Sequence, residues 1–532
     1  MSTTPRLTKV QQGEWLPSGN PWMIAVSVMI ATFMTTLSTS IANVALPHIA
    51  GDLSASTDES TWVLTSYLVA NAIMIPATGW IARRIGRKRL LMLSIAVFTI
   101  ASLLCGMAVN LPMLVLARVL QGMGGGGMQP LAQSILLESF PRRLQGTAMA
   151  VYGTGVVVAP VLGPTLGGWV TDSYSWRWIF YINLPVGVLA LLMAKMYIED
   201  PPYLRQALRK AIDYLGFGMM AVWLGTMQVV LDKGQDADWF GASWIRWFTA
   251  ASAIAFIGFV FRELTHREPI VQLHILADRN FSVGTLINLI YGFVLYGTTA
   301  LLPLFLQTLM GYTALNSGLA VSPRGFGIIL AMILVGMMVN YVDGRLLMVC
   351  GFGLLAYSIF QLSHINLGIS MAAVILPNIL NGFAVGLIFV PLTTMTMGHL
   401  RKEKIGNASG VYNLMRNLGG GIGISVVTAF LQRDSQAHQN YLAANVTAGN
   451  PTARALLQGL QTKFFIGGAS AYAAHQQALG ALYRSIRQQA SLLAYADNFR
   501  LMGYLALVCG SLVMLHYCPA NALRPAEKPF YF

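Results

Sequence analysis

Charged residues are scarce in this chain. Lys, Arg, Asp and Glu make up 10% of its 532 residues, and 55% are hydrophobic. Soluble domains carry about 25% charged residues, because polar side chains must cover their surface. The scarcity of charge therefore excludes a soluble enzyme and indicates a chain whose apolar exterior faces lipid.

Metal-ligating and nucleotide-binding patterns are also missing. The eight histidines are scattered without an HxxxH or HExxH pattern, and the glycine run at 124–127 lacks the Lys-Ser/Thr of a phosphate-binding loop. We therefore expect no cofactor, no metal and no ATP hydrolysis, and a membrane enzyme is disfavoured. Four cysteines lie in or beside apolar runs without metal-ligand spacing and indicate packing residues: Cys105, Cys350, Cys509 and Cys518.

Long uncharged stretches dominate the chain instead. No Asp, Glu, Lys or Arg occurs in 21–51, 60–82, 90–117, 144–171 or 346–400. A helix crosses a bilayer core of about 30 Å with roughly 20 apolar residues, whereas barrel strands alternate over about ten. Counting apolar runs predicts an all-α membrane protein with about fourteen spans. Their centres lie near Phe33, Ile73, Thr99, Gly125, Val156, Leu189, Val222, Ala255, Leu295, Leu330, Leu355, Ala384, Gly423 and Val508.

The net charge of +14 is concentrated between these spans. Basic clusters occur at 83–89, 142–143, 205–210 and 401–404, whereas 52–59 and 232–238 are acidic. Basic loops stay in the cytoplasm, so the pattern predicts cytoplasmic N- and C-termini and no nucleic-acid partner. Residues 1–20 lack the apolar core of a signal peptide, so we expect the first span itself to direct insertion.

One long segment, 433–490, is not apolar enough to span. It is rich in Gln, Ala, Asn and Gly and is predicted to form a loop on the outer face. The run Phe464–Ile466 is too short to cross a bilayer. It fits a surface helix or a contact for a partner protein.

Glycine motifs punctuate the first spans. Gly79, Gly86 and Arg87 belong to the segment 79–88, where glycines permit a tight turn and basic residues hold it at the cytoplasmic face. Alone, this segment is equally a plain basic loop. The fifth span carries a small-residue stripe with prolines that permit bending, which predicts a pliable seam, or tight packing alone. Its members are Gly153, Pro160, Gly163, Pro164, Gly167 and Gly168.

Arg118 lies in the fourth span, followed by Gly122 and Gly126. A charge inside a span costs about 2.5–3.5 kcal/mol on insertion scales, so it usually faces a cavity or a partner. We expect Arg118 to do so. A structural arginine that bonds neighbouring backbone carbonyls is the alternative.

Together these motifs resemble the major facilitator superfamily. The segments 37–47, 62–71 and 176–187 are similar to its fourteen-span drug:proton antiporter branch, the EmrB/QacA-like multidrug efflux permeases. The resemblance covers nearly the whole chain. It implies proton-coupled efflux of small amphipathic toxic compounds by alternating access, with Arg118 associated with proton coupling and the fifth-span stripe with conformational change. The family pattern has Asp where this chain has Arg83 and Ser38.

The resemblance also implies a domain organisation. A six-helix bundle is expected at 21–198, two linker transmembrane helices at 199–268, and a second six-helix bundle at 269–517 that contains the periplasmic loop 433–490. The segments 1–20 and 518–532 are expected in the cytoplasm. Permeases of this branch often work with a periplasmic adaptor (a membrane fusion protein) and an outer-membrane channel, so we expect these partners at the inner membrane of a double-membrane cell.

Three arginines, Arg118, Arg324 and Arg416, are the only clear charges inside the predicted spans. If they face one cavity, it is positive and favours anionic or weakly acidic aromatic substrates over lipophilic cations. Neutral or cationic drugs remain the alternative, as do arginines that cap helices or contact lipid phosphate. Among carboxylates near helix ends, Glu59 and Asp497 are the candidates to accept a proton. Polar candidates for the substrate pathway are Asn43, Asn71, Gln129, Gln133, Asn288, Tyr291, Asn378, Asn381 and Asn413.

Overall fold

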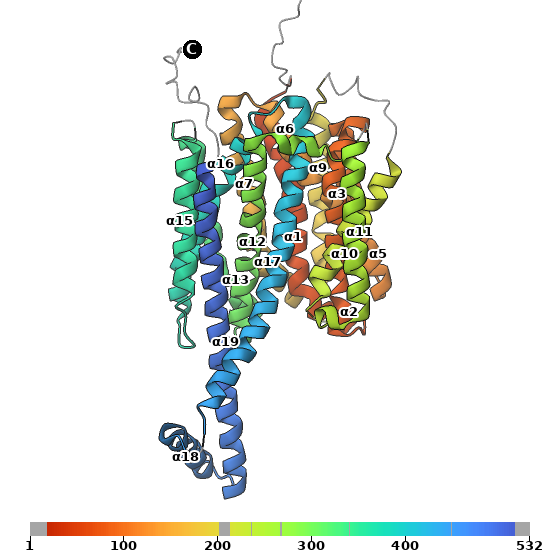
Figure 1. Ribbon diagram of the computed structural model, residues 1–532. Coiled ribbons are helices and arrows are strands. Elements are labelled where there is room, and N and C mark those ends of the chain that lie inside the picture. Colours follow the sequence, from red (N-terminus) through yellow and green to blue (C-terminus); the bar gives the residue numbers. More distant parts are fainter. Residues whose placement is uncertain are drawn as a thin grey trace, which may run out of the picture.

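The computed structural model describes residue 17 and residues 19–201, 213–235, 237–266, 269–339, 341–447 and 449–515. Within these ranges every regular element is a helix, and most helices stand side by side in one bundle (Figure 1). Thirteen of them are long and apolar enough to cross a membrane. The all-helical fold predicted from the uncharged stretches is confirmed.

The first half of the chain forms the helices of one lobe. Their bounds are α1 Pro21–Asp52, α2 Thr57–Ser60, α3 Trp62–Ile85, α4 Arg87–Gly106, α5 Leu111–Gly126, α6 Met128–Ser139, α7 Arg142–Ser173, α8 Trp178–Tyr181 and α9 Asn183–Tyr197. Asparagine side chains begin two of them: Asn20 accepts from the Trp22 backbone N–H and Asn110 from that of Met113, each at 2.9 Å. These caps satisfy backbone donors that a helix start leaves unpaired.

The fourth predicted span, centred near Gly125, consists of two consecutive helices. Gly127 separates α5 from α6 but keeps a right-handed helical conformation, with φ −78° and ψ −21°. Glycine is a poor helix former because it loses much backbone entropy on folding. The glycine run therefore interrupts the helical hydrogen bonds at Gly127, while the backbone keeps a helical conformation there. Each piece is shorter than a full span, which is why thirteen long helices rather than fourteen are found among the described residues.

Two helices, α10 (Tyr214–Lys233) and α11 (Ser243–Thr265), follow the first half and pack against each other. Trp223 of α10 stacks on Phe259 of α11 with ring centroids 5.6 Å apart. α10 also contacts both α3 and the later helix α17. This pair therefore adjoins both halves of the chain.

The second half supplies the remaining helices. Their bounds are α12 Arg279–Thr308, α13 Ala314–Val321, α14 Pro323–Met338, α15 Gly344–Leu362, α16 Met371–Met397, α17 Lys402–Ala444, α18 Pro451–Ile466 and α19 Ala471–Leu512, with short 3-10 turns η3 Leu273–Ala277 and η4 Val513–Leu515. A further 3-10 turn, η2 Trp239–Gly241, lies between α10 and α11. α17 packs on α12 and α3, and α14 packs on α7. The contacts of α17 with α3 and of α14 with α7 join the second half to the first.

α17 and α19 extend far beyond the bundle as a helical hairpin that carries α18 at its tip (Figure 1). They contain 43 and 42 residues, roughly twice the number that a bilayer core requires. The segment 433–490, predicted as a loop, is thus mostly helical. Phe464–Ile466 closes the surface helix α18. We call this side of the molecule the hairpin end, and the opposite side, which carries residues 83–89, 142–143 and 401–404, the basic end.

Candidate transport pathway

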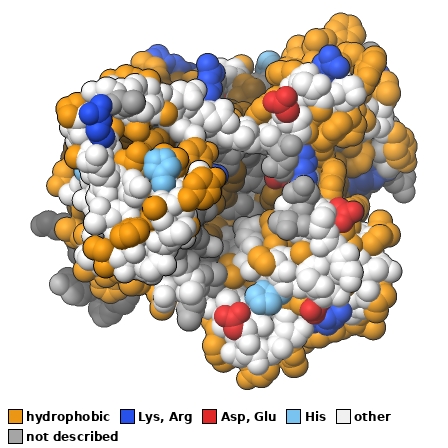
Figure 2. Space-filling model, turned by 90° about the horizontal axis from the view of Figure 1, so that it is seen from below, with side chains coloured by type: hydrophobic (Ala, Val, Ile, Leu, Met, Phe, Trp, Pro, Cys, Tyr) orange, Lys and Arg blue, Asp and Glu red, His pale blue; other side chains and the backbone are white. Residues whose placement is uncertain are grey.

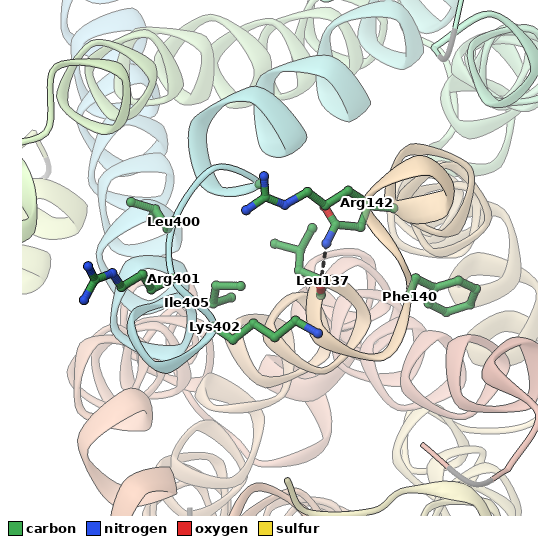
Figure 3. Close-up of a pocket in the computed structure, with 9 residues that line it drawn as sticks. Leu137, Phe140, Arg142, Leu400, Arg401, Lys402 and Ile405 are labelled. Carbon is green, nitrogen blue, oxygen red and sulfur yellow. Dashed lines mark hydrogen bonds between the residues drawn. The ribbon is translucent and has the colours of Figure 1, made fainter. Parts of the chain in front are cut away.

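The two halves touch at the basic end. A Cβ on Gly79 of α3 would lie 2.7 Å from the Gly406 carbonyl oxygen of α17, so only glycine permits this approach. The Thr147 hydroxyl of α7 donates to the Gly336 carbonyl of α14 at 3.1 Å. A small pocket of about 80 Å³ lies between α6, α7, α16 and α17, and Arg142 and Lys402 border it from the two halves (Figure 3). The opposite, hairpin end is hollowed between the lobes (Figure 2).

Gly86 marks the turn between α3 and α4. Its φ of +90° is one that L-residues rarely adopt. The Asp200 carboxylate, which follows α9, fills the space beside Gly86 and accepts from the Lys88 backbone N–H at 2.9 Å. Asp200 therefore brings a carboxylate to a turn whose family pattern has Asp at position 83.

Arg87 forms a buried ion pair with Glu138 of α6. Their side chains are 4% and 2% exposed. The sequence places Glu138 near a helix end and does not indicate its partner. The only sequence signal is its position three residues before Pro141 and close to the basic residues 142–143, which marks a span end at the same face as Arg87.

The fifth-span stripe on α7 touches both halves. Gly163 and Gly167 lie against Ser40 and Ile41 of α1, and Ser40 donates to the Pro160 carbonyl at 3.0 Å. On another face of α7, a Cβ on Gly153 would lie 2.9 Å from both Met332 of α14 and Phe389 of α16. Gly168 has more room, and the side chain of Pro164 lies outside the described part of the structure.

All three predicted intramembrane arginines are buried, and Arg118 is fully enclosed. Its Nε donates to the Val63 carbonyl at 2.9 Å and its Nη1 to Gln121 Oε1 at 2.6 Å. The guanidinium stacks over the Tyr67 ring at 4.2 Å. Nη2 has no hydrogen-bond partner among the described residues. Arg118 thus bonds a backbone carbonyl, as expected of a structural arginine, while its Nη2 stays without a partner among the described residues.

Ser38 lies beside this group. Its hydroxyl oxygen accepts from the side-chain amides of both Gln121 and Asn183, each at 3.4 Å. Gln121 also donates to Ser102 at 2.7 Å. Two long amide contacts converge on one small hydroxyl, at the position where the family pattern has a carboxylate.

Arg416 of α17 occupies the contact between the halves. Its Nη2 donates to Asn413 Oδ1 at 3.3 Å, and Asn413 Nδ2 donates to Gln133 Oε1 of α6 at 2.6 Å. Its Nε, together with Gln133 Nε2 and the Tyr152 hydroxyl of α7, has no partner among the described residues. Tyr152 lies within electrostatic range of Arg416.

Tyr291 of α12 connects the second and third arginines. It interacts electrostatically with both Arg416 and Arg324, and its buried hydroxyl has no partner among the described residues. Arg324 Nη1 donates to Thr299 at 2.7 Å. We call Arg324, Arg416, Tyr291, Tyr152 and Gln133 the central cluster. It places unpaired hydrogen-bond donors from both halves in one buried region.

The other polar pathway candidates have varied surroundings. Asn288 donates to the Tyr412 carbonyl at 2.7 Å, Asn378 to the Ala320 carbonyl at 3.3 Å, and Asn381 to Ser358 at 3.3 Å. These bonds join helices within the second half. Asn71 contacts the Tyr67 hydroxyl, Gln129 is half-buried and Asn43 is exposed.

The two candidate proton acceptors lie at the hairpin end, away from the central cluster. Glu59 caps α2, and bonds from the Ser56 backbone N–H and hydroxyl hold its pKa below the usual range. Asp497 of α19 accepts from His438 Nε2 of α17 at 2.8 Å and from Arg500 at 3.0 Å. No group of three or more metal-ligating side chains is found in the described ranges.

Long apolar helices in two contacting halves, buried arginines at the contact and a hollow at one end define a multi-pass membrane transporter, not an enzyme. The chain belongs to the Major Facilitator Superfamily, whose model matches residues 28–424. It is 37% identical over 509 residues to the fatty acid resistance protein FarB of Neisseria gonorrhoeae, covering 96% of each chain. It is 35% identical over 515 residues to the multidrug export protein EmrB of Escherichia coli K12, covering 96% of this chain and 98% of that one.

Solved structures agree with the fold. The human organic anion transporter MFSD10 superposes with a TM-score of 0.58 at 13% identity, covering 91% of this chain and 99% of that one. The proton:xylose symporter XylE gives 0.57, also at 13% identity, covering 89% and 94%. Similarity at this level of identity concerns architecture alone.

Proposed function

We propose that this protein exports anionic or weakly acidic amphipathic compounds, in exchange for protons, by alternating access. The observation that carries the proposal is the central cluster. Two buried guanidiniums and two buried tyrosine hydroxyls from both halves converge there, and three donor groups, Arg416 Nε, Tyr291 Oη and Tyr152 Oη, have no partner among the described residues.

An anion fits this arrangement. Buried polar groups are normally hydrogen-bonded, and a buried charge without a partner is costly. A carboxylate would accept from the arginine and tyrosine donors together through charge-assisted bonds. FarB, a relative named for fatty acid resistance, is consistent with an amphiphile that carries a carboxylate.

Proton coupling needs a group that binds and releases a proton during the transport cycle. Asp497 is our first candidate because it pairs with His438 across α17 and α19. Glu59 is the second, although its carboxylate already caps a helix. In this scheme Arg118, which donates to the Val63 carbonyl of α3, takes part in the coupling, as the family resemblance implies.

The orientation follows from charge. Basic loops stay in the cytoplasm, so we place the basic end in the cytoplasm and the hairpin in the periplasm of a double-membrane cell, with the protein in the inner membrane. Three exposed apolar side chains, Phe465, Ile466 and Tyr472, lie at the hairpin tip. We propose this tip as the contact for a periplasmic adaptor that leads to an outer-membrane channel.

An efflux assay with matched variants tests the substrate class. Arg416→Gln removes a charge from the central cluster, whereas Arg246→Gln removes one from the exposed surface of α11. We expect cells with Arg416→Gln to lose dodecanoate and benzoate export by at least about tenfold, with Arg246→Gln unchanged. Export of ethidium by a protein that ignores both acids would end the proposal.

A further inference from the structure

A second cavity lies at the base of the hairpin. Its volume is about 630 Å³, and it is an open pocket bordered by the end of α12 and by α17 and α19 where they leave the bundle. α10 reaches it through Gln235. A volume in the range of about 300–1,000 Å³ is typical of sites for drug-sized molecules.

The walls of this cavity are chemically divided. One part is apolar and includes Leu304 and Leu309 near the end of α12 and Leu431 of α17. Another part carries Arg484 and Arg487, which lie three residues apart and therefore on one face of α19, and both side chains are exposed. Such a division matches a molecule with an apolar body and a charged head.

The uncharged polar side chains that line the cavity form hydrogen bonds with one another. Thr308 and Tyr495 hydroxyls lie 3.1 Å apart, Ser435 and Ser491 hydroxyls 3.0 Å apart, and Gln235 bonds Gln432. These bonds tie α12, α17 and α19 together around the space. These hydrogen bonds therefore fix the helices that border the cavity.

The two arginines keep their charge available. Arg487 has no partner among the described residues, and Arg484 makes one long bond, at 3.4 Å, to the Gly480 carbonyl of its own helix. None of the described residues that line the cavity is acidic. The nearby carboxylate of Asp497 is engaged by His438 and Arg500. Guanidinium groups of this kind bind carboxylates and phosphates through paired N–H donors.

We propose that the hairpin-base cavity is a second binding site for amphipathic organic anions, separate from the central cluster. It rests on the proposed function, since it receives the same class of compound on the side of the molecule that bears the hairpin. The carboxylate or phosphate is bound by Arg484 and Arg487, and the apolar body lies against the leucines. The occupant is either an exported organic acid or the head of an anionic phospholipid, because both present the same chemistry.

Binding of a fluorescent fatty acid to the full-length protein tests the site. The probe is 11-(dansylamino)undecanoate, titrated into neutral phosphatidylcholine nanodiscs with empty nanodiscs as blank. We expect two classes of site, one of which weakens by about tenfold or more in R484Q/R487Q. The matched control R454Q/K463Q removes two cations from α18 and leaves both classes unchanged. Size-exclusion profiles verify that each variant is folded.

The outcomes separate the two proposals. If R416Q weakens one class and R484Q/R487Q binds like wild type, the hairpin-base site is refuted and the exporter proposal stands. If the wild-type protein binds no probe, both fail. Loss of one class in each variant supports both.

Competition identifies the occupant. Displacement of the probe from the arginine-dependent class by dodecanoate supports a site for exported acid. Displacement by phosphatidylglycerol in the nanodisc supports a lipid headgroup. Competition by neither, at concentrations that empty the central class, overturns the site.

Discussion

Arg118 is a buried cation that several contacts hold in place, although its hydrogen bonding is incomplete. Its planar fork reaches the Val63 carbonyl, the Gln121 amide and the Tyr67 ring at once, and one nitrogen is left over. Only a guanidinium can make these contacts together, since an ammonium is a point charge on a flexible stem. We therefore expect that a positive charge alone at this position does not support transport.

We predict that Arg118→Lys reduces proton-driven export by about tenfold or more while the protein still folds. The measurement is uptake of dodecanoate into inverted vesicles, with Arg246→Lys on α11 as control. Full activity in Arg118→Lys would show that charge alone is needed and that the stacking on Tyr67 is incidental.

The ion pair of Arg87 and Glu138 makes a second prediction. Removing one partner of a buried pair leaves an uncompensated charge, which costs about 3–5 kcal/mol. Glu138→Gln should therefore lower the melting temperature in detergent markedly, and the double variant Arg87→Leu/Glu138→Leu should recover much of the loss. Equal melting of Glu138→Gln and wild type would contradict the burial of this pair.

Sequence reasoning reached some of these residues and missed others for a physical reason. A charge inside an apolar run is visible in one segment, so the burial of Arg118, Arg324 and Arg416 could be predicted. The pairing of Arg87 with Glu138, and the approach of Asp200 to Gly86, join residues far apart in the chain. Such contacts depend on helix packing, which no local pattern specifies.

At the scale of elements, α10 and α11 are held together at their ends nearest the basic loops. Asp213 caps α10 through the Gly216 backbone N–H at 3.0 Å and accepts from Arg262 Nε and Nη2 of α11 at 3.1 Å. Burial alone would raise the pKa of Asp213, but the bonds from Arg262 and Gly216 outweigh it and lower the pKa. The Asp213 carboxylate thus caps the N-terminus of α10 and also binds α11 through Arg262.

This pKa shift predicts a pH dependence of stability. A carboxyl whose pKa is lower in the folded state stabilises the fold fully above its unfolded pKa of about 3.9, and less as pH falls through the folded pKa. We expect Asp213→Asn to melt below wild type at pH 7, with the gap narrowing toward pH 3. A gap that stays constant over this range would show that the carboxylate charge contributes nothing.

Element prediction from the sequence was most successful where apolar runs were long. The predicted spans correspond to helices because a chain in the bilayer must satisfy its backbone hydrogen bonds internally. A helix does this within one long apolar run. For the segment 433–490, the polar composition predicts a loop. The segment is largely helical, since α17 and α19 continue out of the bundle and pack on each other there. Polar composition distinguishes buried from exposed residues and does not distinguish a helix from a loop.

At the scale of the whole molecule, the halves meet at the basic end while the hairpin end is hollowed. Alternating access requires these basic-end contacts to separate during each cycle. α7 and α14 offer a direct test, because the Ala150 Cβ lies 3.5 Å from the position of a Cβ on Gly336. That spacing is within the range that a disulfide requires.

We predict that Ala150→Cys/Gly336→Cys, in a background without the native cysteines, forms a disulfide on oxidation and loses export. Reduction with dithiothreitol should restore it, and Ala150→Cys alone should be unaffected by oxidant. Vesicle export before and after treatment is the measurement. Undiminished export by the fully cross-linked protein would mean that the halves do not part between α7 and α14.

The length of α19 has one more consequence. About twenty of its residues precede the part that lies in the bundle, and at 1.5 Å each they extend roughly 30 Å beyond it, with α18 packed against them. In the assembly proposed above, an arm of this length would set the distance at which the periplasmic adaptor is met. A hydrophobic compound transferred to the adaptor at that distance would enter a protein-lined passage. It would not return to the bilayer, in which it would otherwise dissolve.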